Sequence, residues 1–289
     1  MERKTNMKLS TRILVLLCLM AVGLIVALAA IQLVGSQNLL TALTLQDVIV
    51  FIAPAVAAMA IFYRKPLNAM CLDRAPRWAW LLIVVLFYCV SLPAMNWLVD
   101  LNAGMKLPAG MSGLEAWMKQ TEELAAKGTE QLLDIHSVGM LLATVFVVGF
   151  MAGLSEEILF RGAALRTMQD SRLNTHVVVW TVAAVFSAYH MQFYGFLPRM
   201  VLGAWLGYLL VWSRNLWVPI IAHTLNNSTV VVMSYLANKG IVAKEMSDTL
   251  GLPAEGAFPW LALCSLVASI ALAVWAGRYF TNSEKKRQI

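Results

Sequence analysis

Residues 138–160, VGMLLATVFVVGFMAGLSEEILF, form the stretch that decides the fold class of this chain. A bilayer core is spanned by about 20 predominantly apolar residues in an α-helix, and residues 138–155 contain no charged side chain. Similar blocks recur along the 289 residues, of which 60% are hydrophobic and 13% charged. A soluble domain carries about 25% charged residues. The sequence therefore predicts an all-α, polytopic membrane protein.

We predict a bundle of about eight transmembrane helices in a single domain that covers residues 1–289. The predicted spans are Ile13–Val34, Val48–Tyr63, Ala79–Val99, Val138–Phe160, Val177–Gly195, Leu197–Ser213, Leu216–Leu236 and Trp260–Phe280. The second span is short for a bilayer crossing. No separate soluble domain and no internal repeat is visible in the sequence.

The distribution of positive charge predicts the topology. Lys and Arg cluster after the second, fourth, sixth and eighth spans, whereas residues 36–46 contain none and three lysines in residues 100–136 are diluted by acids. The positive-inside rule then places both termini in the cytoplasm. We expect a multi-pass protein of the cell (inner) membrane. Arg199, Lys239 and Lys244 lie on the opposite side and are exceptions. The net charge of +6 reflects this topology and does not indicate nucleic acid as a partner.

The long loop between the third and fourth spans predicts one further helix, over residues 112–128. Ser112 and Glu115 fit a capping box, which starts a helix. Leu114, Trp117 and neighbouring apolar residues recur at helical spacing, and Gly128 is a candidate helix stop. We expect an amphipathic helix on the extracytoplasmic side. It would anchor the loop to the membrane surface or cover a cavity as a lid.

Two adjacent carboxylates, Glu156 and Glu157, stand at the end of the fourth span. A charged side chain at mid-bilayer costs about 2.5–3.5 kcal/mol on insertion scales, so such residues are usually functional. Solvation at the interface, with Glu157 paired to Arg161 one turn later, would be the structural alternative. The candidate site residues on other spans favour a buried polar site.

Polar residues on two later spans lie at matching depths. His190 ends the apolar run that begins at Val177, and His223 and Asn227 are four residues apart, so they share one helix face. Counted at about 1.5 Å per residue from the basic turns, these residues and Glu156 can reach one level in the cytoplasmic half of the membrane. Each polar residue taken alone could simply link helices.

Together these residue types are sufficient for hydrolysis. Burial and a neighbouring carboxylate make Glu156 a competent general base near neutral pH. One imidazole can hold the attacking water, while a second imidazole and an amide can donate hydrogen bonds to an oxyanion. No serine or cysteine is evidently placed as a nucleophile.

At these residues the sequence resembles the CAAX-protease and bacteriocin-processing family, also called the Abi family. The family pattern E-E-x-x-x-R, F-x-x-x-H and H-x-x-x-N matches Glu156 to Arg161, Phe186 to His190 and His223 to Asn227, in that order. The resemblance covers about residues 153–231. It implies an eight-helix intramembrane glutamic endopeptidase.

The resemblance also implies roles for the residues. Glu156 and His190 would activate water, His223 and Asn227 would form the oxyanion site, and Glu157 and Arg161 would support the geometry. The expected partners are a membrane-associated peptide or protein substrate and the lipid bilayer. The substrate would be prenylated, or a bacteriocin-like or pheromone-like peptide. No cofactor and no metal is expected.

Three other functions remain open at this point. Glu156, His190 and His223 could ligate zinc in a metallopeptidase, although no H-E-x-x-H motif is present. Buried Glu and His residues also relay protons in transporters, which usually show paired repeats. A catalytically silent scaffold would use the same residues to bind a membrane partner.

Overall fold

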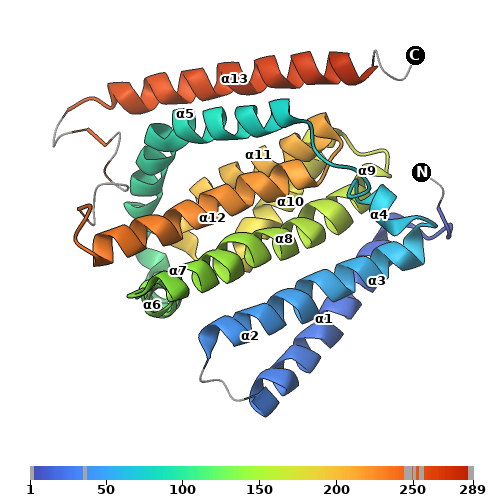
Figure 1. The fold of residues 1–289 in the computed structure, drawn as a ribbon, viewed down its shortest axis with the longest axis horizontal. Helices are drawn as coiled ribbons and strands as arrows, with labels where there is room; N and C mark the ends of the chain where they lie inside the picture. The colour runs from blue at the N-terminus through green and yellow to red at the C-terminus, as the bar shows by residue number, and fades with distance from the viewer. Residues whose placement is uncertain (1–2, 35–37, 244–248, 250–251, 254–256, 286–289) are drawn as a thin grey trace.

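The computed structural model describes residues 3–34, 38–243, 249, 252–253 and 257–285. Every regular element in this part is a helix, and an isolated β-bridge joins Arg3 to Tyr63. Most of the helices run roughly along one direction, whereas the second half of α5 turns away from it and α6 crosses the end of the others (Figure 1). The predicted all-α, polytopic fold is confirmed.

Long helical rods make up the bundle, and some of them combine two or more helices. Its helices are α1 (Leu9–Val34), α2 (Leu39–Gln46), α3 (Ala53–Phe62), α4 (Pro66–Ala69), α5 (Trp78–Ala103), α6 (Ser112–Leu133), α7 (Val138–Thr144), α8 (Ala152–Glu157), α9 (Arg166–Gln169), α10 (Thr175–Tyr189), α11 (Phe196–Ser213), α12 (Trp217–Asn238) and α13 (Trp260–Lys285). The π-helical segment Asp47–Ile52 joins α2 to α3. Two more, Val145–Met151 and Ile158–Leu165, join α7, α8 and α9 into one rod.

Each predicted span corresponds to a helix. In the described residues, six helices are long and apolar enough to cross a membrane, which makes this a multi-pass membrane protein. The predicted fifth span is the apolar but shorter α10. The predicted seventh span is α12, whose hydropathy is lowered by the polar residues from His223 to Ser228.

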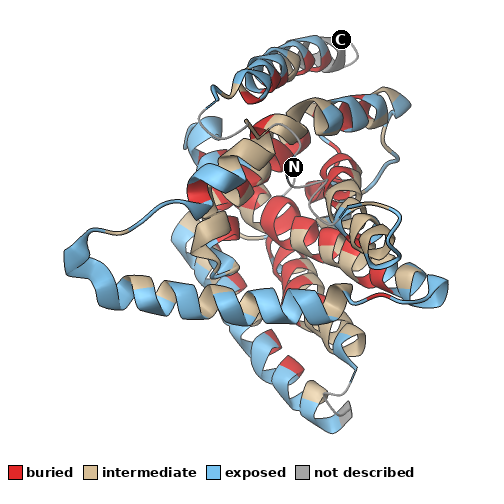
Figure 2. Ribbon diagram, turned by 90° about the vertical axis from the view of Figure 1, so that its left-hand side faces the viewer, coloured by how far each residue is buried: buried red, intermediate tan, exposed pale blue. Residues whose placement is uncertain are grey.

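Several predicted boundaries are wrong. The fifth span ends at Tyr189 rather than Gly195, because the chain reverses at Met191. The second span begins at Leu39 rather than Val48, because the helix continues through Asp47 despite its charge. Helix α6 runs through Gly128 to Leu133, and Ser112 is its first residue rather than its cap. A glycine weakens a helix interior by only about 1 kcal/mol, so Gly128 does not end α6. This helix is largely exposed and crosses the face shown in Figure 2.

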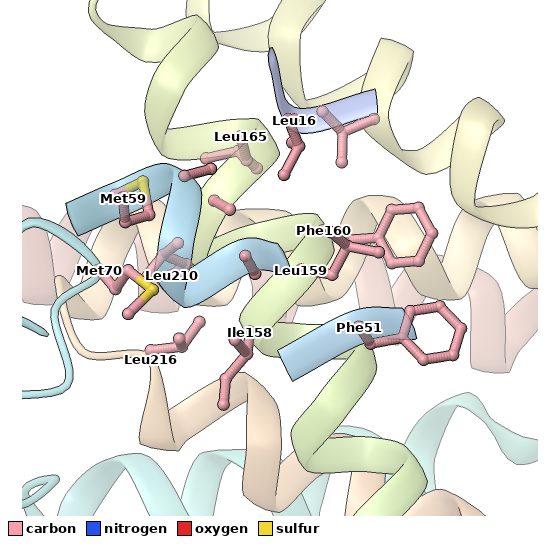
Figure 3. Close-up of a cluster of buried hydrophobic side chains, with 14 of the residues drawn as sticks. Leu16, Phe51, Met59, Met70, Ile158, Leu159, Phe160, Leu165, Leu210 and Leu216 are labelled. Atoms are coloured by element: carbon pink, nitrogen blue, oxygen red, sulfur yellow. The ribbon is translucent and has the colours of Figure 1, made fainter. Parts of the chain in front are cut away.

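The principal hydrophobic core surrounds the π-helical segment 158–165. Leu159 and Leu165 are almost fully buried there, together with Met59 on α3 and Leu210 on α11. Figure 3 shows these side chains meeting between the helices. This packing holds the segment that follows Glu156 and Glu157 rigidly in the bundle.

Helix α13 covers α5 at the point where Pro93 interrupts it. Proline has no N–H and breaks the regular helix bonding. The Ser265 hydroxyl of α13 donates to the Val90 carbonyl (2.5 Å) and accepts from the Ala94 amide (3.2 Å). It thereby bonds both groups at the break, and α5 bends at this level (Figure 1).

A polar network fastens the N-terminal segment to the turn between α9 and α10. The Asp170 carboxylate accepts from the Tyr63 hydroxyl (2.7 Å), from Arg3 (3.1 Å) and from Arg12 (3.2 Å). Burial raises the pKa of Asp170, but these hydrogen bonds and charges outweigh burial and hold the pKa below its usual value. The start of α1 thus lies beside a basic turn.

The start of α1 and the end of α13 lie at the same end of the bundle (Figure 1). We predict that this end is cytoplasmic, because the basic turns near Arg74, Arg172 and Arg214 also lie there. Reporter domains fused after Arg74 and after Ile289 are expected to report from the cytoplasm, and one after Asp134 from the opposite side. A reporter at Arg74 that is active only outside would contradict this topology.

Candidate active site

Glu157 and Arg161 form a fully buried ion pair at the centre of the bundle. Both side chains are 0% exposed, and Nη1 of Arg161 lies 2.6 Å from Oε1 of Glu157. Nη2 of Arg161 donates to the Gly203 carbonyl on α11 (2.8 Å). The guanidinium also lies over the Phe186 ring of α10, 4.6 Å from its centroid. The pair therefore links three helices and is not solvated at an interface.

His223 bridges the two glutamates. Its Nδ1 lies 2.9 Å from Oε1 of Glu157, so the proton of this bond is on Nδ1 if Glu157 is ionised. Its Nε2 faces Oε2 of Glu156 at 3.7 Å, which is too long for a hydrogen bond. That Glu156 oxygen is buried and has no hydrogen-bond partner among the described residues. It is therefore available as a proton acceptor.

His190 lies at the end of α10, where its orientation is set by the backbone. Its Nδ1 donates to the Phe186 carbonyl (2.9 Å), which leaves Nε2 as the acceptor in the neutral ring. The Phe186 ring packs against the imidazoles of both His190 and His223. His190 also interacts electrostatically with Glu156 and His223. Met191 then adopts a left-handed conformation (φ 55°), which reverses the chain.

Asn227 shares a face of α12 with His223, but its amide is engaged elsewhere. Its Nδ2 donates to the Val148 carbonyl (3.2 Å), and its Oδ1 accepts from Asn226 (3.2 Å). Among the described residues, Asn227 has no direct hydrogen bond to the glutamates or to His190. The structure therefore joins Glu156, Glu157, Arg161 and His223 in one cluster with His190 nearby, and places Asn227 one helical turn away.

Two glycines allow α12 to approach the helix that carries the glutamates. A Cβ at Gly149 would collide with the side chain of Ser228, and a Cβ at Gly153 would lie 3.2 Å from the Thr224 amide nitrogen. Side chains at these positions would push α12 away. Because His223 reaches the glutamates from α12, the glycines are required for that contact.

Asp47 is a third buried carboxylate, and it was not among the residues predicted from the sequence. It is 5% exposed, and its Oδ1 accepts from the hydroxyl of Ser155, the residue before Glu156 (2.9 Å). Its Oδ2 is buried and has no hydrogen-bond partner among the described residues. Asp47 is a single acidic residue inside the apolar stretch 39–62, and this pattern could have identified it. The predicted span began at Val48 and therefore left Asp47 out.

Replacement of Asp47 by asparagine is expected to separate stability from function. The amide can still accept from Ser155, while a buried negative charge is removed, so the thermal midpoint in detergent should stay equal or rise. Turnover should nevertheless fall, by about tenfold, a modest loss for a group placed beside a general base. The hypothesis is that Asp47 supports activity and lowers the stability of the protein. A destabilised but normally active variant would contradict it.

A cavity of about 1120 Å³ lies along α12, and its described lining includes none of the candidate site residues. Helices α5 and α12 provide most of its lining, and the second half of α6 lines it as well. Its lining includes Gln192, two residues after His190, and Asn226, the residue before Asn227. A cavity of this size can hold a small ligand or a peptide segment.

Three features of the described residues bear on chemistry. π-Helical segments precede and follow α8, and such segments are frequent at functional sites. No group of three or more His, Cys, Asp or Glu residues in the described part of the chain is arranged to hold a metal ion. The Glu156–His223 pair is instead held by the buried Glu157–Arg161 pair.

The fold and the site together define the class of this protein as a membrane-embedded helical bundle with a buried Glu–His cluster. Residues 138–229 match the family described as type II CAAX prenyl endopeptidase Rce1-like, so the resemblance drawn from the three motifs is confirmed over that segment. The family is one of membrane endopeptidases.

Among curated proteins, "Uncharacterized protein YpbD" of Bacillus subtilis (strain 168) is 29% identical over 98 residues, or 32% of this chain. The matched part spans 45% of that relative. No solved structure matches the chain.

Proposed function

We propose that this protein is an intramembrane endopeptidase that hydrolyses a peptide bond of a membrane-associated substrate. The observation that carries the proposal is the buried, unpartnered Oε2 of Glu156 opposite Nε2 of His223. A carboxylate kept without a partner in an apolar bundle is costly, and a proton acceptor is what a hydrolase needs at this place.

In the proposed mechanism, Glu156 takes a proton from a water molecule that His190 helps to orient. The water oxygen attacks the scissile carbonyl, and the proton passes to the leaving amine. With both ring nitrogens of His223 protonated, Nδ1–H bonds to Glu157 and Nε2–H donates to the developing oxyanion. Asn227 joins it when its amide turns away from Val148. The Glu157–Arg161 pair holds His223 through Nδ1, so that Nε2 faces the reaction.

The proposed substrate is a peptide or protein anchored in the bilayer, such as a prenylated protein or a bacteriocin-like peptide. The cavity beside α12 would receive its apolar portion. The decisive experiment compares the membrane-associated peptides of cells that produce the wild-type protein with those of cells that produce the Glu156→Ala variant. Precursors that accumulate only with the variant identify substrates. Identical peptide profiles would contradict the peptidase proposal and favour a carrier or a scaffold.

Asn227→Ala is expected to lower turnover by about 10²–10³-fold, as for loss of one oxyanion donor. Substrate affinity should change much less, because the donor acts in the transition state. Turnover and binding of the same peptide should be measured in liposomes. Val232→Ala, at an exposed position of the same helix outside the cavity lining, serves as the control. Equal losses in both variants would point to a general loss of α12 packing.

A further inference from the structure

Arg199 is a positive charge that the fold and the proposed mechanism leave unexplained. It stands in the first turn of α11, on the side of the membrane where basic residues are scarce. It follows the short turn Phe193–Gly195, which connects His190 to α11. Charged residues at such places in membrane proteins usually mark a ligand or ion pathway.

The contacts of Arg199 hold it in place without neutralising it. Its Nη2 donates to Oε1 of Gln192 (2.8 Å), and its Nη1 donates to the Gln192 carbonyl (3.3 Å). Its Nη2 also lies so close to Gly195 that a Cβ there would be 3.0 Å away. None of the ion pairs in the described part of the chain involves Arg199. A guanidinium has five N–H donors, so donors remain for an anion.

The surroundings place this guanidinium between the candidate active site and α6. Arg199 interacts electrostatically with Glu156, His190 and Glu122. Glu122 belongs to α6 and accepts from the Tyr194 amide (3.3 Å). Trp117 of α6 packs on Phe193 of the same turn. Helix α6 therefore lies against the turn that presents Arg199.

Gln192, the hydrogen-bond partner of Arg199, lines the large cavity. It is two residues from His190. A ligand in the cavity that carries an anionic group could replace Gln192 at the guanidinium, beside the turn that follows His190. Guanidinium and carboxylate groups match each other in a bidentate geometry.

We propose that Arg199 is a binding residue for a carboxylate of the substrate, carried either by its C-terminus or by an acidic side chain. This inference rests on the proposed function, which places the scissile peptide bond of the substrate at Glu156. Arg199 thus selects which peptides are held at Glu156, whereas the glutamates and histidines act on the bond itself.

Binding of matched peptides tests this inference. The probe is a fluorescein-labelled S-farnesyl peptide in phosphatidylcholine nanodiscs, made with a free C-terminal carboxylate or a C-terminal amide. A second, C-terminally amidated pair carries an internal Asp or Asn. Affinity is measured with the Glu156→Gln protein, which retains the side-chain shape and does not consume the probe. Wild-type hydrolysis of the same peptides is recorded separately.

One carboxylate form is expected to bind about 10–100-fold more tightly than its amide partner, as for a charged hydrogen bond. Adding Arg199→Gln should abolish the preference. Glu122→Gln should increase it, because a competing negative charge is removed. Gln192→Leu should keep it, because the guanidinium remains, and this variant controls for loss of the Arg–Gln contact.

Two results would overturn the inference: equal affinities for both members of both pairs, or a preference that survives Arg199→Gln. The pair that shows the preference distinguishes a C-terminal carboxylate from an acidic side chain. If the preference is present but the wild-type protein hydrolyses none of the peptides, the carboxylate site stands and the peptidase proposal fails for these peptides.

Discussion

Replacement of Glu156 by glutamine is expected to lower peptide turnover by about 10²–10⁴-fold, the usual contribution of a general base. Glutamine keeps the shape of the side chain but cannot accept a proton from water. The Glu157–Arg161 pair does not involve Glu156, so the bundle should remain intact. Turnover of a peptide identified from the membrane comparison should be measured in liposomes, with protein insertion checked by fractionation.

Glu123→Gln provides the control, because Glu123 is an exposed residue of α6 and the same chemical change there should leave turnover unaltered. Combining Glu156→Gln with His190→Ala should cost less than the sum of the separate losses, since groups that act on one water are not additive. A folded and inserted Glu156→Gln protein that cleaves at the wild-type rate would end the peptidase proposal. The carrier and scaffold functions would then take its place.

Replacement of Arg161 by alanine is expected to destabilise the protein by about 3–5 kcal/mol, as for a broken buried ion pair. Three losses combine: Glu157 keeps a buried charge without its partner, the Gly203 carbonyl loses its donor, and the Phe186 ring loses the cation above it. Thermal unfolding in detergent and accumulation in the membrane should both show the effect. Arg172→Ala, at an exposed turn position, is the matched control.

A second variant separates folding from chemistry. Replacing Glu157 and Arg161 together with leucine and methionine removes both charges, and such exchanges of buried pairs are often neutral or stabilising. The double variant should accumulate better than Arg161→Ala yet stay inactive, because His223 loses its Nδ1 partner. An Arg161→Ala protein with normal stability and activity would show that the pair does not support the site.

The sequence by itself determined the fold class and most of the helix positions. Blocks of about 20 apolar residues leave few alternatives to membrane helices, because every backbone polar group must be satisfied inside the bilayer. It also determined which residues to consider as a site. Glu157 and Arg161 are four apart, as are His223 and Asn227, and this spacing places each pair on one face of its helix.

Only the tertiary structure decided which partner each polar side chain takes. Asp47 joins Ser155 from a helix more than a hundred residues earlier, and Asn227 turns to a backbone carbonyl rather than to the glutamates. Neither contact follows from helical spacing, because distances between helices depend on packing at positions such as Gly149 and Gly153. Periodicity specifies a face of one helix, whereas close packing of all the helices determines what that face meets.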